Sequence, residues 1–121
     1  IGVTPSNDGV VRLPSNTGIG FFSTAAINIG ISGIIEAVAT DLGRGLPVTL
    51  KLCETKVTGE TIKCGNNLSR TVNANETLYY TIFVTGTGKT IPLDPAVNRL
   101  FLLLGNANGL YGATNIAVTA P

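Results

Sequence analysis

The amino-acid sequence predicts an all-β protein, an antiparallel β-sandwich of about seven to nine strands in one domain. Three observations predict this fold class. Apolar and polar residues alternate with period two in several stretches, turn residues recur roughly every 8–12 positions, and no stretch has the apolar period of an amphipathic helix. Glycine is frequent, with 15 residues, and only 12% of the chain is charged, a composition that favours strands joined by many turns.

Charge and hydropathy argue against several partners. The formal net charge is +1, and the Lys and Arg residues are scattered from Arg12 to Arg99, whereas nucleic acid or an acidic membrane calls for a basic stripe. The apolar run at residues 100–104 is far shorter than a membrane span. We therefore expect no nucleic-acid partner and no membrane span.

Residues 1–20 are predicted to be an N-terminal extension, and residues 21–121 the sandwich domain. In the extension, prolines and an Asn-Asp-Gly turn interrupt every pattern except the short apolar run 10–13. The strands that follow are predicted at residues 19–22, 25–31 and 34–40.

The next stretch predicts a β-hairpin closed by a disulfide. Residues 48–52 alternate between apolar and polar, as in a strand with one buried face. If residues 58–59 form the loop, counting outward places Cys53 opposite Cys64, within the distance that a disulfide needs. The alternatives are two free thiols or half of a zinc site, but the gap between the cysteines is too long for paired zinc ligands and the chain has no histidine.

The disulfide also predicts a compartment, because such bridges persist outside the cytoplasm. The chain contains no methionine, so we expect either a mature product whose signal segment has been removed or a piece of a longer protein. The expected location is extracellular.

The remaining strands are predicted from the alternation of apolar and polar residues and from the turn residues between them. Residues 69–72 predict a short edge strand, and at 78–84 the apolar residues share one face of a long strand. Residues 98–104 are apolar on both faces after Arg99, which is typical of a strand buried on both sides. An Asn-Gly hairpin loop at 106–109 then leads to a last alternating strand at 114–118.

Several short motifs carry a family resemblance. They are residues 30–35, 46–50, 53–55 with Cys64, 82–85, 94–95 with 98–101, and 112–114 with Val118. With these motifs, residues 21–119 resemble the immunoglobulin-like modules strung together in large secreted bacterial cell-surface proteins. The resemblance implies an immunoglobulin-like β-sandwich at the cell surface, and it implies no catalytic residue, because the matching residues are turn, core and bridge positions.

Two candidate chemical sites have simpler explanations. Residues 84–90 end in Gly-Thr-Gly-Lys-Thr, like a P-loop, but Pro92 and Pro95 exclude the helix that should follow, so we interpret them as a polar loop. The acidic residues are spread over separate turns and strand faces, and without histidine there is no Ser-His-Asp or Cys-His arrangement. We therefore predict no catalytic residue and no cofactor, and that the protein is not an enzyme.

Turn residues provide weaker candidates. Residues 7–9 and 41–43 could each supply a calcium ligand or two, but a calcium site needs six to eight oxygens, and ordinary turns explain both, so we predict no metal. Asn67 and Asn75 each begin an Asn-X-Ser/Thr sequence and are candidate glycosylation sites, with chance matching as the alternative.

Apolar and aromatic side chains suggest two kinds of partner. A sugar could stack on aromatic rings, although tryptophan is absent; the candidates are Phe21, Phe22, Tyr79, Tyr80 and Tyr111. Self-association is the second possibility, since the apolar residues Phe83, Phe101 and Leu103 lie opposite core residues on their strands. The strand containing Val10, Val11 and Leu13 could add itself to an open sheet edge of a neighbouring copy.

These observations predict a non-catalytic extracellular structural protein. It would be a β-sandwich subunit or repeat of a cell-surface filament or adhesin stalk, a homopolymer or tandem array assembled by N-terminal strand addition. The alternative is a glycan-binding accessory module of a secreted protein.

Overall fold

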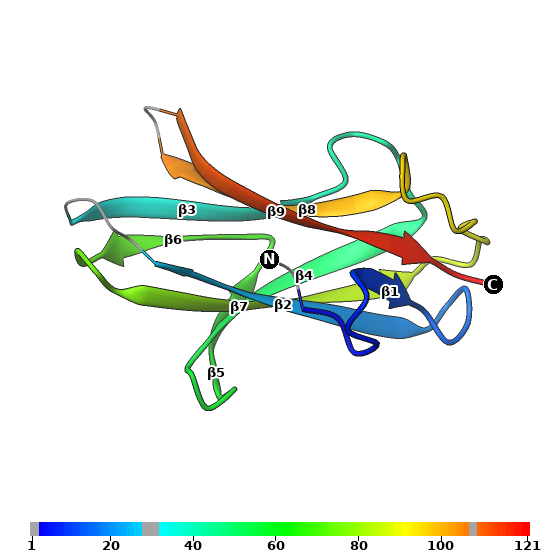
Figure 1. Cartoon of the computed structure of the whole chain (residues 1–121), viewed down its shortest axis with the longest axis horizontal. Helices are drawn as coiled ribbons and strands as arrows, with labels where there is room; N and C mark the ends of the chain where they lie inside the picture. The colour runs from blue at the N-terminus through cyan, green and yellow to red at the C-terminus, as the bar shows by residue number, and fades with distance from the viewer. Residues whose placement is uncertain (1–2, 28–31, 107–108) are drawn as a thin grey trace.

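A computed structural model describes residues 3–27, 32–106 and 109–121. These residues form nine strands and no helix, arranged as two stacked sheets (Figure 1). The five-stranded sheet has the order β1-β9-β8-β3-β6, and the four-stranded sheet has the order β2-β7-β4-β5. The bounds are β1 Val10–Arg12, β2 Ile19–Ile27, β3 Gly33–Thr40, β4 Val48–Thr55, β5 Thr61–Gly65, β6 Asn67–Val72, β7 Thr77–Gly86, β8 Arg99–Asn106 and β9 Gly109–Thr119.

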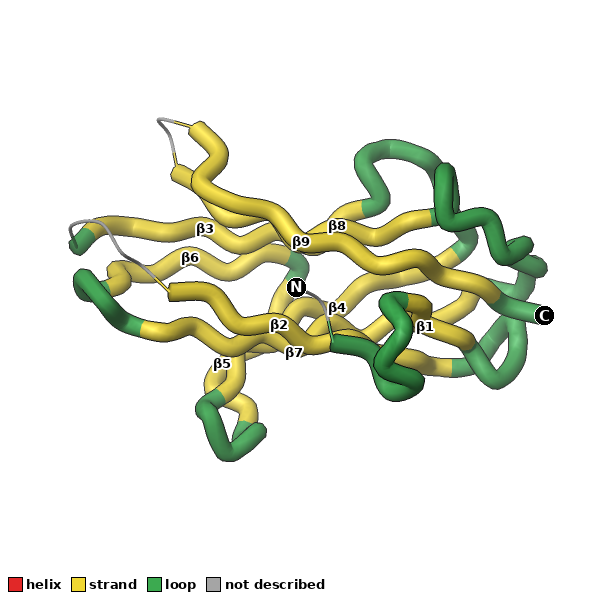
Figure 2. Tube along the Cα trace, viewed as in Figure 1, coloured by secondary structure: helices red, strands yellow, loops and turns green. Residues whose placement is uncertain are grey.

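The prediction of an all-β sandwich is confirmed. Every strand pair is antiparallel except β1 and β9, which run parallel. The tube view shows the two sheets lying over each other, connected by loops at both ends (Figure 2). None of the residues that the structure describes belongs to a helix that could cross a membrane.

The core lies between the sheets and is filled by alternate side chains of each strand. The expected buried face of β7 is confirmed, since Leu78, Tyr80, Ile82 and Val84 are at most 3% exposed. They pack with other fully buried apolar residues of both sheets, among them Phe22, Leu52, Leu100, Leu102, Ile116 and Val118. Burying such side chains is the dominant favourable term for folding a domain of this size.

Two predicted strands differ in detail. The apolar bursts at 19–22 and 25–31 belong to the single strand β2 as far as Ile27, and residues 28–31 lie outside the described part of the chain. On β8, Leu100 and Leu102 are buried, but Phe101 and Leu103 on the other face are only partly buried. The prediction of burial on both faces is therefore wrong, because no further layer among the described residues covers the outer face of the five-stranded sheet.

The hairpin between β4 and β5 has the predicted cysteine pairing, but its loop length and its register differ from the prediction. Lys56 N donates to Glu60 O at 2.8 Å, and Gly59 adopts φ 89°, so the loop has three residues, 57–59, where two were expected. A bulge then shifts the register by one, because Thr55 pairs with Thr61 whereas Glu54 pairs with Lys63. The two shifts cancel, and Cys53 lies opposite Cys64 as predicted.

Candidate interaction surfaces

The N-terminal segment, residues 3–13, contacts both sheets of its own chain. Val3 forms an isolated bridge with Ser23 on β2, in which Val3 N donates to Ser23 O at 2.6 Å and Ser23 N donates to Val3 O at 2.9 Å. Further along, β1 pairs with β9. Val11 and Leu13 are 1% and 3% exposed, and Val10 is partly buried. In this structure the strand is not detached: its side chains belong to the core of their own chain.

Glycines on the four-stranded sheet make room for this segment. A Cβ atom at Gly20 would lie 2.7 Å from Val11 Cγ1 and 3.0 Å from Leu13 Cδ2. At the end of β7, a Cβ atom at Gly86 would lie 3.2 Å from Leu13 Cδ1 and would also overlap the backbone carbonyl of Asn16, just beyond the segment. A side chain at either position would therefore displace the segment. We call this site, bounded by Gly20, Gly86 and the edge of β9, the N-terminal socket.

The loop from residue 14 to 18 connects β1 to β2 and is held against the end of β7. Gly86 N donates to Gly18 O at 2.9 Å, and Gly88 N donates to Asn16 O at 2.8 Å. Gly86 and Gly88 belong to the P-loop-like stretch. Since their amides already bond to carbonyl groups of the chain, they are not presented to a phosphate, which agrees with the interpretation of a polar loop.

The outer face of the four-stranded sheet is apolar at one end. Ile19 and Phe21 on β2 and Phe83 on β7 are 62%, 43% and 37% exposed. Phe21 and Phe83 are direct register partners, with ring centroids 6.4 Å apart. Lys51 on β4 completes the same row. It is the only charged residue on the outward face of β2, β7 and β4 among the residues described.

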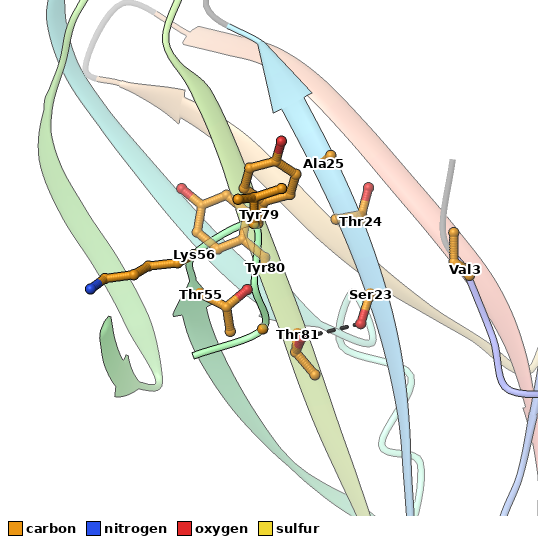
Figure 3. A pocket seen from close by; sticks show the side chains of 11 residues that line it. Val3, Ser23, Thr24, Ala25, Thr55, Lys56, Tyr79, Tyr80 and Thr81 are labelled. Carbon is orange, nitrogen blue, oxygen red and sulfur yellow. Dashed lines mark hydrogen bonds between the residues drawn. The ribbon is translucent and has the colours of Figure 1, made fainter. Parts of the chain in front are cut away.

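A groove of about 330 Å³ crosses the other end of this face (Figure 3). Ser23 and Thr81 lie on its floor, with hydroxyl oxygens 3.1 Å apart, and Tyr79 lies beside them. Lys56 and its hairpin neighbours line one side and Val3 the opposite side. The groove therefore offers hydroxyl groups and the ring of Tyr79, between the β4–β5 hairpin and Val3.

The β4–β5 hairpin that forms one wall projects away from the sandwich (Figures 1 and 2). The Cys53–Cys64 disulfide holds it, with Cα atoms 4.0 Å apart, and confirms the predicted bridge. Val57 at the hairpin tip is 76% exposed. The bridge therefore fixes the base of an element whose tip packs little against the rest of the chain.

The structure separates the residues predicted for self-association. Val10, Val11 and Leu13 lie in the socket, and Phe83 lies on the outer face of the four-stranded sheet. Phe101 and Leu103 lie on the outer face of the five-stranded sheet, opposite Thr40 and Val38 of β3. These residues therefore do not form one common surface.

An ion-pair cluster that connects the two sheets was missed from the sequence. Arg70 on β6 donates to both carboxylate oxygens of Glu54 on β4, at 2.8–3.0 Å, and to Glu76 at 2.8 Å. The Glu54 side chain is only 6% exposed, and that of Arg70 is 37% exposed. The sequence could have indicated that Arg70 faces the core. Side chains two positions apart on a strand lie on the same face, and Arg70 stands between the buried residues Leu68 and Val72.

This cluster shifts the ionisation of its neighbours. The hydrogen bond from Arg70, together with one from Asn73 N, holds the pKa of the Glu76 carboxyl below its ordinary value. Burial, with the nearby negative charge of Glu54 as a second cause, raises the pKa of Tyr80 to about 12. The charged groups bond to one another, so their evident role is to join the sheets.

In the two turns considered as calcium sites, the carboxylates form hydrogen bonds or ion pairs with residues of the same turn or close to it. Asp8 Oδ1 accepts hydrogen bonds from Ser6 and Val10, and Asp8 Oδ2 lies 2.8 Å from Arg12. Asp41 accepts from the backbone amides of residues 43 and 46, each at 2.9 Å. Such bonds are typical of ordinary turns.

The candidate glycosylation and sugar-stacking residues are only partly accessible. Asn67 and Asn75 are exposed, Asn75 in a turn with φ 64° and Asn67 as the first residue of β6. Phe22 and Tyr80 are buried in the core and offer no surface to a sugar. Phe21 and Tyr79 share the outer face of the four-stranded sheet, and the side chain of Tyr111 lies outside the described part of the structure.

In comparisons with known proteins, no protein-family model and no curated protein matches this chain.

Proposed function

We propose that this protein is a non-catalytic extracellular structural protein, an immunoglobulin-like subunit or repeat of a cell-surface filament or adhesin stalk. Its partners are copies of itself. The observation that supports the proposal most strongly is the N-terminal socket, where Val11 and Leu13 fill the space left by Gly20. The segment that contains Val11 and Leu13 thus completes the core of the sandwich.

The socket supports assembly by strand exchange. The contacts of Val11 and Leu13 are the same whether the segment belongs to the same chain or to a neighbour, so exchange between copies conserves the packing. The loop of residues 14–18 is the hinge, and its bonds from Gly86 and Gly88 must rearrange when it opens. Exchange in one direction joins copies head to tail, which gives an open filament.

The strand order supports the immunoglobulin-like assignment. An immunoglobulin sandwich places its strands B-E-D on one sheet and C-F-G on the other. Here β2-β7-β4 and β3-β8-β9 stand in these orders. The N-terminal segment contacts both sheets, pairing first with β2 at Val3 and then with β9. The disulfide is compatible with an extracellular location.

The strand exchange is tested by a covalent trap between Arg12 and Thr119. These residues are register partners on β1 and β9, at a strand separation that suits a disulfide. The double variant Arg12→Cys/Thr119→Cys is concentrated with the new thiols reduced and is then oxidised. We expect a ladder of covalent multimers on a non-reducing gel, because β1 of one copy occupies the socket of the next.

The outcomes are distinct. The single variant Arg12→Cys is the matched control and gives dimers at most. If the double variant yields only internally bridged monomer at every concentration, the segment stays in its own chain and assembly by strand exchange is rejected.

The groove supports the alternative of a glycan-binding accessory module. Ser23 and Thr81 offer hydroxyl groups, and the ring of Tyr79 beside them offers an apolar surface. This function predicts that the monomer is retained on a polysaccharide column and that Tyr79→Ala abolishes retention. Elution of the wild-type chain in the void volume of several neutral polysaccharide columns would reject it.

A further inference from the structure

We infer that the outer face of the four-stranded sheet is a second contact surface, on which the same face of another copy packs. The inference rests on the proposed function and deepens it, because it names the surface that joins neighbouring filaments or repeats side by side. It is separate from the N-terminal socket, which lies between the sheets.

Exposed apolar side chains concentrate on this face. Eleven large apolar residues are exposed in the part of the chain that the structure describes. Five of them lie on or beside β2 and β7, namely Val3, Ile19, Phe21, Ile27 and Phe83, and two more lie in the β4–β5 hairpin. Ile19, Phe21 and Phe83 lie together at one end of the face, and an exposed apolar patch marks an interaction site.

The low charge of this face favours a second copy of the protein as its partner. Of the residues that the structure describes, Lys51 is the only charged one on the outward face of β2, β7 and β4. A strongly charged partner would leave its own charges unpaired against this surface, which is costly. Two copies of this face bring only one charged side chain each, Lys51, whose long stem lets its ammonium group stay in water, and a two-fold dimer needs only one self-complementary patch.

The area is sufficient for a weak dimer. β2 has nine residues, and the three strands β2, β7 and β4, spaced by about 4.8 Å with a rise of about 3.3 Å per residue, give a face of roughly 30 by 14 Å. Two such faces bury roughly 850 Å², an area typical of weak, transient contacts. In a filament or array, the high effective concentration of neighbouring copies would strengthen so weak a contact.

The shape of the face is compatible with this packing. Twisted sheets pack face to face at about 30°. The projecting hairpin stands at one end of the face (Figure 1), beside the groove floored by Ser23 and Thr81. In a two-fold pair, the two hairpins would stand at opposite ends, each against the edge of the other sheet.

The test uses the oxidised, internally bridged Arg12→Cys/Thr119→Cys monomer, in which strand exchange is blocked. Its mass is followed by analytical ultracentrifugation from roughly 10 µM to 1 mM, the range in which an interface of this size is expected to associate. We expect a reversible dimer. Adding Phe21→Thr and Phe83→Thr should weaken the dimer at least tenfold, whereas Ile34→Thr, at a 59% exposed residue of the other sheet, should leave it unchanged.

Thermal unfolding of each variant verifies that it is folded, and Thr81→Lys is a second variant that places a charge on the face without removing an aromatic residue. A bridged monomer that never associates, or an equal loss of association in Ile34→Thr, overturns the inference. Retention of that monomer on a polysaccharide column in place of dimerisation would assign the face to a glycan. A dimer in this test with no ladder in the strand-exchange experiment would reject only the exchange.

Discussion

Arg70 on β6 holds the carboxylate of Glu54 on β4 by three hydrogen bonds and so connects the two sheets of the sandwich. The Glu54 side chain is almost fully buried at this contact. Loss of Arg70 therefore leaves the buried Glu54 carboxylate without its partner, whereas Arg70 keeps its bond to Glu76 when Glu54 is lost.

Arg70→Ala should destabilise the fold by about 2–4 kcal/mol, because it leaves the Glu54 carboxylate buried and unpaired. Urea unfolding at neutral pH measures the loss. Glu54→Leu/Arg70→Met is the matched control and should recover most of the stability, because apolar residues of similar volume replace the pair. Equal destabilisation in the single and double variants would contradict this role.

Tyr80 should make the fold sensitive to alkali. Its pKa is raised to about 12 in the folded state, mainly by burial, while that of an unfolded tyrosine is about 10. The stabilising contribution of the neutral phenol is therefore complete below pH 10 and is lost as the pH rises from 10 towards 12. In this interval the unfolding free energy of the wild type should fall with pH more steeply than that of Tyr80→Phe. The difference should be about 1.4 kcal/mol per pH unit, the value for the release of one proton on unfolding.

Urea midpoints at pH 8, 10 and 11 test this prediction. At pH 8 the two proteins should have nearly equal stability. A parallel decline of both above pH 10 would show that another group controls the alkaline transition.

The Cys53–Cys64 bridge should contribute about 2.5–3 kcal/mol, the value that the chain-entropy model gives for so short a loop. Cys53→Ala/Cys64→Ala should lose this amount in urea unfolding, and hydrogen exchange should become faster in β5. The reduced wild-type chain is the control and should lose a similar amount. A loss below about 1 kcal/mol in both would contradict the model.

Gly20→Ala should loosen the N-terminal segment. The added methyl group would lie 2.7 Å from Val11 Cγ1, and overpacking of this kind costs about 1–3 kcal/mol. Amide hydrogen exchange of residues 10–13 should become faster than in the wild type. Gly112→Ala on β9 is the control, since a Cβ atom there would meet nothing within 4 Å. Unchanged protection of residues 10–13 in Gly20→Ala would argue against the socket.

The local sequence predicted those parts of the fold that depend on the alternation of apolar and polar residues along a strand. The buried face of β7 and the pairing of Cys53 with Cys64 follow from side-chain period and from counting along the chain. The bulge near Thr55 was not predictable, because an extra residue in a strand leaves no mark in its composition.

Long-range relationships were the least predictable from the sequence. The pairing of β1 with β9 joins opposite ends of the chain, and no local pattern specifies a partner at that distance. The parity of Arg70 could have placed it inside the sandwich, but only the structure shows that Glu54 meets it there. Surfaces such as the Phe21–Phe83 row likewise require the register between strands.

The most direct test of self-assembly is electron microscopy of the native material taken from the surface of the cells that produce it. We expect linear arrays with a repeat on the order of 35–40 Å, the length of an 11-residue strand such as β9 at about 3.4 Å per residue. Isolated single particles under all conditions, with no array in the native material, would contradict it.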